Sequence, residues 1–325
     1  MEHARRVPAS VLLALVVVLT AAGCRDSALQ PESATVDATP TPTVSAQVRT
    51  PEPQARPKPT RSKKPAASPS PSITVPDIKI PKSFDGRVTG GDVSWPQCPK
   101  GMGIPQKRSL GLPMPVPSAK FVILGLTNGP GFTPNPCLPA QVQWVKDRGL
   151  MAAAYAVNSY PDDRTLAEHG DDGPFDGSDR LGALSNVGYQ QARYNIATMR
   201  SAGLSSPIVW MDVEPVPVFE WSSDREANAA VIVGAARGYT DAGYPIGTYS
   251  TPALWEGVVG DLRLNVPEWR AAGQTSMAEA LRRCEDDWMF AGGHGVLGQW
   301  VEHGRDRNVT CPGTSSQMYR WFHQY

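Results

Sequence analysis

The sequence predicts an α/β fold of the (β/α)8 or TIM-barrel type in residues 86–325, preceded by a signal peptide and a disordered linker. Short apolar runs alternate with longer amphipathic segments in this region, as in a parallel sheet with crossover helices. Eight candidate strands in 240 residues favour a closed barrel over an open doubly wound sheet. No G-x-G-x-x-G follows a strand, which argues against a dinucleotide fold.

The expected elements follow from these two patterns. Gly149, Gly203 and Gly243 each follow an amphipathic segment, at the point where a helix is expected to stop. The candidate helices are residues 140–148, 187–202, 225–242, 252–259 and 277–284. The candidate strands are residues 91–94, 121–126, 151–157, 208–213, 246–250, 268–272, 289–291 and 296–301.

Charge is divided unevenly along the chain. The 31 basic and 31 acidic side chains cancel, but residues 1–85 carry a net charge of +4 and residues 86–325 a net charge of −4. Nucleic-acid-binding proteins normally have a strong basic excess. The acidic domain therefore argues against a nucleic acid or another polyanion as partner.

Residues 1–24 have the plan of a lipoprotein-type signal peptide. Arg5 and Arg6 precede an apolar run at 11–19, and small residues precede Cys24. That run is about half of the roughly 20 residues that a spanning helix needs. We favour acylation of Cys24, including palmitate, and anchoring at the outer face of the cell membrane. The alternative is an ordinary signal peptide cut near Gly23, which would give a secreted protein.

Residues 25–85 are predicted to be a disordered linker. Between positions 31 and 82 there are 12 Pro and 13 Ser or Thr, without apolar periodicity. Such a composition cannot bury enough apolar surface to offset chain entropy. In polyproline conformation, at about 3.1 Å per residue, 52 residues would reach on the order of 160 Å.

The cysteines of residues 86–325 are even in number and lie in a chain predicted to be exported. They form no C-x-x-C motif, and no His stands at metal-ligand spacing beside them, so disulfides are favoured over a zinc site. Three pairings are possible. We predict Cys98 with Cys137 and Cys284 with Cys311, because each pair consists of sequence neighbours flanked by loop residues.

Two acidic residues follow the fourth apolar run. Asp212 and Glu214 are two positions apart, so on an extended segment both carboxylates face the same side. Catalytic side chains of a barrel lie at the carboxyl ends of its strands. Neighbouring carboxylates raise each other's proton affinity, so one can stay protonated near neutral pH, as glycosidic cleavage requires. The alternative is helix capping or pairing with Arg225; we favour the functional interpretation.

Other polar and aromatic residues accompany these acids. Asp92 lies in the first strand, where a buried acid is costly unless it is paired or functional. Tyr155 and Tyr249 can supply hydroxyl donors to a substrate, although both can equally be core residues. Trp300 can stack on a sugar ring, although most tryptophans in a domain of this size are core residues. The segment 162–179 is predicted to be a rim loop, and it does not match a calcium-loop pattern, so no metal site is expected.

Seven short blocks in residues 90–311 together resemble glycoside hydrolase family 25, the lysozyme-like N-acetylmuramidases. They read, in order, GGDVSWPQ, FVILGLTNG, AAAYAVNSY, VWMDVEP, IGTYSTPALW, PEWRAAG and LGQW. The resemblance implies a β/α barrel that cleaves the β-1,4 bond between N-acetylmuramic acid and N-acetylglucosamine in peptidoglycan. It implies no cofactor.

The resemblance also assigns roles to residues. Glu214 matches the general acid, Asp212 the carboxylate that orients the substrate acetamido group or stabilises the cation, and Asp92 the strand-one aspartate. Thr310 stands where the family has a further acid, and Asp306, four residues earlier, is the candidate substitute.

Two functions are therefore open. The first is a membrane-anchored glycoside hydrolase, expected to be a monomer, that acts on cell-wall glycan through Glu214. The second, motivated by Thr310, is a catalytically weakened barrel that binds cell-wall glycan or a protein partner.

Overall fold

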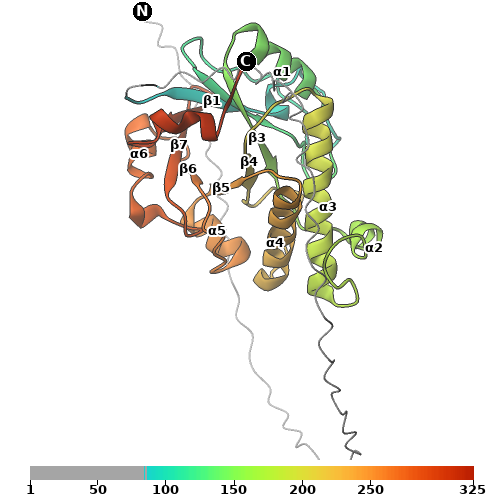
Figure 1. The fold of residues 1–325 in the computed structure, drawn as a ribbon. Coiled ribbons are helices and arrows are strands. Elements are labelled where there is room, and N and C mark those ends of the chain that lie inside the picture. The colour runs from blue at the N-terminus through green and yellow to red at the C-terminus, as the bar shows by residue number, and fades with distance from the viewer. Residues whose placement is uncertain (1–83, 85) are drawn as a thin grey trace, which may run out of the picture. The chain divides into compact units, whose positions relative to one another are not determined.

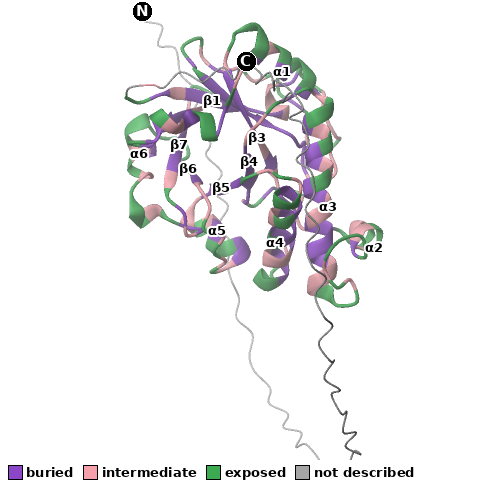
Figure 2. Ribbon diagram, in the orientation of Figure 1, coloured by how far each residue is buried: buried purple, intermediate pink, exposed green. Residues whose placement is uncertain are grey.

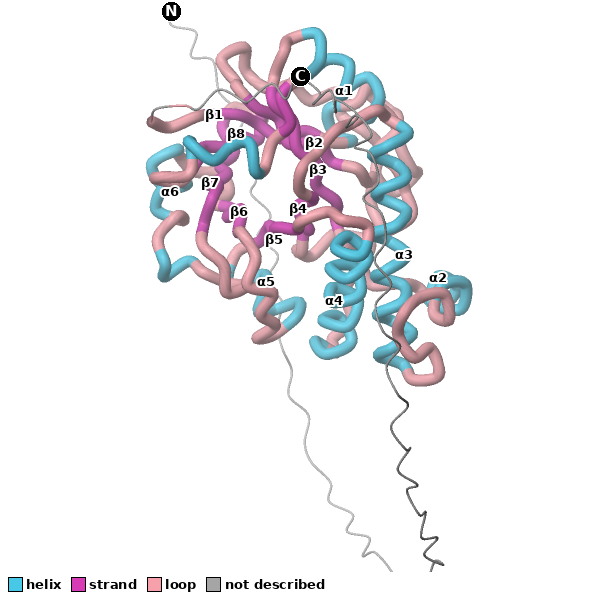
Figure 3. The backbone as a smooth tube through the Cα atoms, in the orientation of Figure 1, coloured by secondary structure: helices cyan, strands magenta, loops and turns pink. Residues whose placement is uncertain are grey.

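A computed structural model describes Phe84 and residues 86–325, and this part of the chain forms a closed eight-stranded barrel (Figure 1). Neighbouring strands pair in the order β2-β1-β8-β7-β6-β5-β4-β3, and β3 also pairs with β2, which closes the ring (Figure 3). The predicted α/β barrel is confirmed. The strands are β1 (Thr89–Val93), β2 (Phe121–Gly125), β3 (Met151–Val157), β4 (Val209–Asp212), β5 (Ile246–Ser250), β6 (Glu268–Ala271), β7 (Gly295–Glu302) and β8 (Arg305–Thr310), and a short β9 (His323–Gln324) pairs with β3.

The eighth strand runs against the others. Strands β1 to β7 are parallel, whereas β8 is antiparallel to both β7 and β1. Glu302 pairs with Arg305 across a two-residue turn, in which His303 and Gly304 have φ of 51° and 67°. Positive φ at both positions is typical of a type I′ hairpin turn. Within the confirmed barrel, the last unit departs from a regular (β/α)8 pattern, because this turn takes the place of a crossover helix.

The segment 289–291, predicted to be a strand, is irregular. The backbone N–H groups of Phe290 and Ala291 donate to the Glu268 carboxylate at 3.2 and 2.8 Å, so they do not join a sheet ladder. The strand that completes the barrel is instead β8. Its sequence has no apolar run: Asp306 lines a cleft, and Asn308, two residues later, donates to Asp92.

Six α-helices lie outside the ring of strands in the described region, with their outward sides exposed and the strands largely buried (Figure 2). Asp179 caps the third helix by accepting from Gly182 N, which places its start before the predicted residue 187. The predicted rim loop at 162–179 contains a further helix, which is capped by Asp162. The helices are α1 (Leu138–Asp147), α2 (Asp163–His169), α3 (Arg180–Ser201), α4 (Arg225–Asp241), α5 (Pro252–Val259) and α6 (Met277–Arg282).

Helices α3 and α4 approach to backbone contact through two glycines. A Cβ on Gly188 would lie 1.9 Å from the Val231 carbonyl oxygen, and one on Gly234 would lie 1.8 Å from that of Ser185. No side chain fits at either position. The outer core fills the space between these helices and the strands, and a second core, including Trp210 and residues of β2 and β3, fills the barrel interior.

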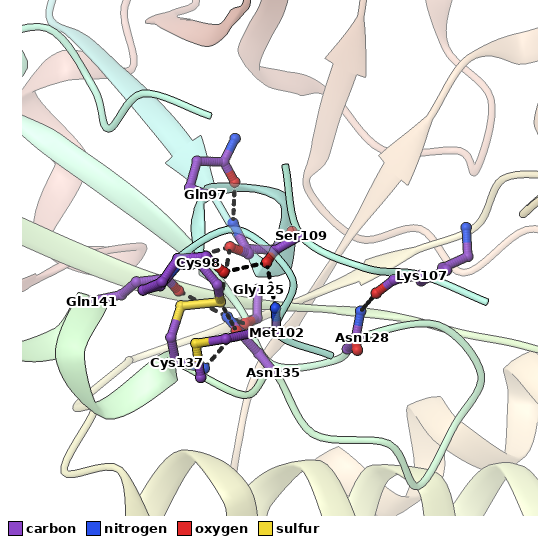
Figure 4. Close-up of a disulfide and its surroundings, with 12 residues drawn as sticks. Gln97, Cys98, Met102, Lys107, Ser109, Gly125, Asn128, Asn135, Cys137 and Gln141 are labelled. Carbon is purple, nitrogen blue, oxygen red and sulfur yellow. Dashed lines mark hydrogen bonds between the residues drawn. A yellow bond between two sulfur atoms is a disulfide. The ribbon is translucent and has the colours of Figure 1, made fainter. Parts of the chain in front are cut away.

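Two disulfides secure the loops of the barrel. Cys98 bonds Cys137 and Cys284 bonds Cys311, with Cα atoms 5.6 and 5.5 Å apart, so the predicted pairing is confirmed. The first bridge ties the β1–β2 loop to the start of α1 (Figure 4). Beside it, Asn135 donates to the Gly125 carbonyl at 2.8 Å, which holds the β2–α1 loop against its own strand.

The predicted signal peptide, Cys24 and nearly all of the predicted linker lie outside the described residues. Within the described part of the chain, no helix is both long and apolar enough to cross a bilayer.

Candidate active site

A cleft of about 450 Å³ opens at the carboxyl ends of the parallel strands, and all four predicted acids line it. Asp92 lies near the end of β1, Asp212 ends β4, and Glu214 follows two residues later. Asp306 reaches the cleft from β8. Four carboxylates from three strands and one loop therefore converge in one place.

The reversed direction of β8 explains why Asp306 belongs to this cleft and Thr310 does not. Because β8 is antiparallel, its first residues lie at the carboxyl ends of the other strands. Thr310 lies at the opposite end of β8, where its hydroxyl accepts from Val88 N at 3.0 Å. The threonine therefore does not take the place of an acid in the cleft.

Asp92 is held by two amide side chains from neighbouring strands. Asn308 Nδ2 donates to its Oδ2 at 2.6 Å, and Gln299 Nε2 donates to the same carboxylate at 3.2 and 3.3 Å. Gln299 and Asn308 are direct partners across the β7–β8 ladder. Each amide is fixed in turn: Tyr249 OH donates to Gln299 Oε1 at 2.8 Å, and Trp269 Nε1 donates to Asn308 Oδ1 at 2.7 Å.

The backbone that carries Asp212 and Glu214 is fixed on both sides. Asn158 N donates to the Asp212 carbonyl at 2.9 Å, and the indole N–H of Trp221 donates to the Glu214 carbonyl at 2.9 Å. Between the two acids, Val213 is fully buried. The extended backbone therefore directs both carboxylates into the cleft, as the two-residue spacing predicts.

Glu214 is the acid with opposing charged neighbours. Burial raises the pKa of Glu214, the charge of Asp306 raises it further, and the Lys107 ammonium lowers it in part. Burial likewise raises the pKa of Asp306. A carboxyl group with a raised pKa keeps its proton closer to neutral pH, which is the property of a general acid.

The two deeper acids are also protonated more readily than usual. Burial raises the pKa of Asp92 well above its ordinary value, and the Asp306 charge adds to this, while the hydrogen bonds from Asn308 and Gln299 act in the opposite direction. Burial, and then the charges of Glu214 and Asp92, raise the pKa of Asp212. Each of the four carboxyl groups in the cleft therefore binds a proton more readily than an isolated acid does.

Lys107 brings a positive charge to the cleft from the β1–β2 loop. Its backbone carbonyl accepts from Asn128 Nδ2 at 3.1 Å, and its side chain extends away from the Cys98–Cys137 bridge (Figure 4). The ammonium lies 5.7 Å from the centre of the Trp95 ring. The disulfide-tied loop therefore places this cation beside Glu214.

Two of the three predicted substrate-binding residues lie in the cleft. Tyr155 and Tyr249 line the cleft, but Trp300 does not: it is 2% exposed and packs on the outer side of β7 against Ala280. Side chains alternate along a strand, so Gln299 faces the interior and Trp300 faces out. The prediction for Trp300 is therefore wrong.

Other residues in the cleft were not predicted as site residues. Trp95 and Trp269 add aromatic surface to the cleft, Gln299 and Lys107 line it, and Asn308 donates to Asp92 from behind. The period of two along β7 and β8 was the available signal for the two amides. Within residues 86–325, no three His, Cys, Asp or Glu side chains are grouped as a metal site requires.

No protein-family profile and no curated protein matches this sequence. Among solved structures, it is similar to a lysozyme from Streptomyces coelicolor (15% identity, TM-score 0.45, covering 71% of this chain and 94% of that one). It is similar to a family GH25 lysozyme from Aspergillus fumigatus (14% identity, TM-score 0.43, covering 72% of this chain and 99% of that one). It is also similar to the modular autolysin LytC from Streptococcus pneumoniae, solved with a synthetic peptidoglycan ligand (13% identity, TM-score 0.41, covering 69% of this chain and 46% of that one). The match therefore spans less than half of LytC.

Proposed function

We propose that this protein is a glycoside hydrolase that cleaves cell-wall glycan by muramidase-type chemistry, with peptidoglycan as its substrate. The observation that carries the proposal is the convergence of Asp92, Asp212, Glu214 and Asp306 on one cleft. Cleavage of a glycosidic bond requires a protonated carboxylic acid beside the leaving oxygen and a second carboxylate near the anomeric carbon. A cleft of about 450 Å³ has the size of a small-ligand site.

Glu214 is the proposed general acid. The negative charge of Asp306 and the burial of Glu214 both favour its protonated form. It donates that proton to the glycosidic oxygen as the bond from the anomeric carbon to this oxygen breaks. Water then adds its hydroxide to the anomeric carbon, and its remaining proton returns to a carboxylate of the site.

Asp212 and Asp92 support the positive charge that develops on the sugar. Asp212 Oδ1 has no hydrogen-bond partner among the described residues, so it is free to accept from a substrate acetamido N–H. Asp92 cannot rotate, because Asn308 and Gln299 both donate to it. A fixed carboxylate stabilises a cationic transition state without reorganising during the reaction.

A barrel that only binds glycan is the alternative to an enzyme. That alternative depended on Thr310 as a missing acid. Thr310 lies at the other end of β8 from the cleft, and Asp306 lines the cleft, so no observation favours the alternative.

Glu214→Gln tests the proposed activity. We expect release of reducing ends from purified peptidoglycan to fall by about 10²- to 10⁴-fold, the usual contribution of a general acid. Glu256→Gln, which changes an exposed acid on α5 in the same way, should keep wild-type activity. A wild-type protein that releases no reducing ends, or a fully active Glu214→Gln variant, would contradict the proposal.

We further propose that the enzyme acts outside the cytoplasm as a monomer, held at the outer face of the membrane by acyl chains on Cys24. The basic residues, apolar run and small residues before Cys24 support this location.

A further inference from the structure

A second hollow of about 540 Å³ lies beside the catalytic cleft, and the proposed reaction uses none of it. We propose that this hollow, named here the stem groove, binds the peptide stem that peptidoglycan carries on its sugars. The inference rests on the proposed function and narrows the substrate to peptide-bearing glycan. The residues that carry it are Phe132, Arg164, His169, Gln191, Val218 and Glu220.

The stem groove and the cleft are lined by neighbouring residues of the same two loops. Gly129 lines the cleft and Pro130 the groove, and in the β4–α4 loop Pro217 lines the cleft and Val218 the groove. At both points, consecutive residues of one loop therefore line the two hollows. A substituent on a sugar in the cleft therefore needs to cross only the edge of a loop to enter the groove.

The groove has an unused hydrogen-bond acceptor in its lining. Gln191 is 1% exposed, and its Nε2 donates to the Ser159 carbonyl at 2.9 Å. Its Oε1 has no partner among the described residues. A buried polar atom is normally paired, because leaving it unpaired is costly. The N–H groups of a peptide are donors of the kind that this oxygen lacks.

Two bulky residues of the groove hold backbone conformations that L-residues rarely adopt. Phe132 has φ of 65° and stacks on His169, with ring centroids 4.3 Å apart. Val218 has φ of 79° and is 64% exposed. Strained conformations of this kind gather at ligand clamps and active sites. Here they place an aromatic ring and an apolar side chain around one hollow.

The charges of the groove match a peptide better than a sugar. Its lining holds one cation, Arg164 on α2, and three exposed acids: Asp162, Glu168 and, in the β4–α4 loop, Glu220. A stem peptide carries free carboxylates and an amino group. The glycan without its peptide carries no amino group, and its only carboxylate is the lactyl group of N-acetylmuramic acid. A guanidinium binds carboxylate through charge-assisted hydrogen bonds, and Glu220 can accept from an ammonium. The three acids of the groove therefore find a cationic partner only when the glycan bears its peptide.

The test measures binding without turnover. In the Glu214→Gln full chain, we compare the dissociation constants of a muropeptide, the disaccharide with its peptide stem, and of the same disaccharide with a simple amide on its lactyl group in place of the peptide. We expect the muropeptide to bind about tenfold tighter or more, which is the effect of one charge-assisted contact. Arg164→Ala should remove most of this preference, and the matched change Arg193→Ala, at an exposed position of α3, should keep it.

Phe132→Gly provides a second variant that is expected to fold. Glycine tolerates φ of 65°, so the substitution removes the aromatic ring without demanding a strained backbone. It should also reduce the preference for the muropeptide. Equal affinity for both ligands, or a preference that survives both substitutions, would overturn the stem groove.

The two proposals fail separately. Wild-type protein that cleaves glycan strands stripped of peptide, but shows no muropeptide preference, would support the hydrolase and overturn the groove. Protein that cleaves nothing would overturn the hydrolase, while the affinity ratio in the Glu214→Gln chain would still decide the groove.

Discussion

At the scale of single residues, the orientation of Asn308 follows from its neighbour. An indole N–H can only donate, so Trp269 requires the oxygen of the Asn308 amide to face it at 2.7 Å. The amide nitrogen must then face Asp92, to which it donates at 2.6 Å. Trp269 thereby fixes the hydrogen bond from Asn308 to Asp92, although Trp269 makes no hydrogen bond to Asp92 itself.

Lys107 gives a pH-dependent prediction at this scale. Its ammonium lowers the pKa of Glu214, so Lys107→Gln should raise that pKa. A general acid works while protonated, and its loss of the proton sets the alkaline limb of the pH–rate profile. We therefore expect the alkaline limb of kcat/KM on peptidoglycan to move to higher pH. Lys100→Gln, at an exposed position of the same loop, should leave the profile in place; a shift to lower pH in Lys107→Gln would contradict the prediction.

The sequence predicted three of the acids from apolar strands, and it reached Asp306 on the polar strand β8 only through the family resemblance. The positions of Asp92, Asp212 and Glu214 follow from strand periodicity, because each stands near the end of an apolar run. The alternation of side chains along β7 also puts Gln299 and Trp300 on opposite faces of the sheet. The sequence does not say which of the two faces the barrel interior. Lys107 had no such signal, because its place depends on a long loop folded back by a disulfide.

At the scale of elements, a buried ion pair organises the connection from β6 to β7. Arg270 Nε donates to Glu268 Oε2 at 2.9 Å, and both side chains are almost completely inaccessible. Arg270 also donates to the carbonyls of Arg283, Glu285 and Gly293. The pair therefore joins the strand to the loop that follows α6.

Glu268→Gln should destabilise the barrel strongly. The change leaves the Arg270 guanidinium buried without its counter-charge, and breaking one side of a buried pair costs about 3–5 kcal/mol. The free energy of unfolding of the full chain, from urea denaturation at neutral pH, measures this cost. Glu285→Gln is the control, because that side chain is exposed and Arg270 contacts only its carbonyl. A loss below about 1 kcal/mol for Glu268→Gln would contradict the interpretation, since that is the scale of an exposed pair.

The sequence predicted helices and strands correctly where capping residues and apolar periodicity decide their bounds. Helix α5 has its predicted bounds, since Thr251 caps its start and Pro252 fits the first turn. The segment 289–291 and β8 were misassigned for one reason: tertiary contacts decide them. In the segment 289–291, the backbone N–H of Ala291 donates to the Glu268 carboxylate and not to a neighbouring strand. Strand β8 forms through pairing with β7 and β1 despite its polar sequence.

At the scale of the whole molecule, the zero net charge is a balance between unlike parts. Residues 1–85 carry +4 and residues 86–325 carry −4, and four of the acids of the second part line one cleft. Burying acids together raises their pKa values and costs folding stability, and groups perturbed in this way cluster at functional sites. The acidic excess that argues against a polyanion partner thus includes the proposed catalytic groups.

The proposed anchoring gives the prediction at this scale. Two or more acyl chains on Cys24 would hold the full chain firmly at a membrane, because each buried methylene adds about 0.8 kcal/mol. In a bacterial host that processes lipoproteins, the wild-type chain should incorporate labelled palmitate and sediment with membranes. Cys24→Ala should lose the label and most of the membrane-bound fraction, whereas Ser27→Ala, three residues later, should keep both. If Cys24→Ala and wild type divide alike between membrane and medium, the N-terminal segment acts as an ordinary signal peptide and the domain reaches the wall unanchored.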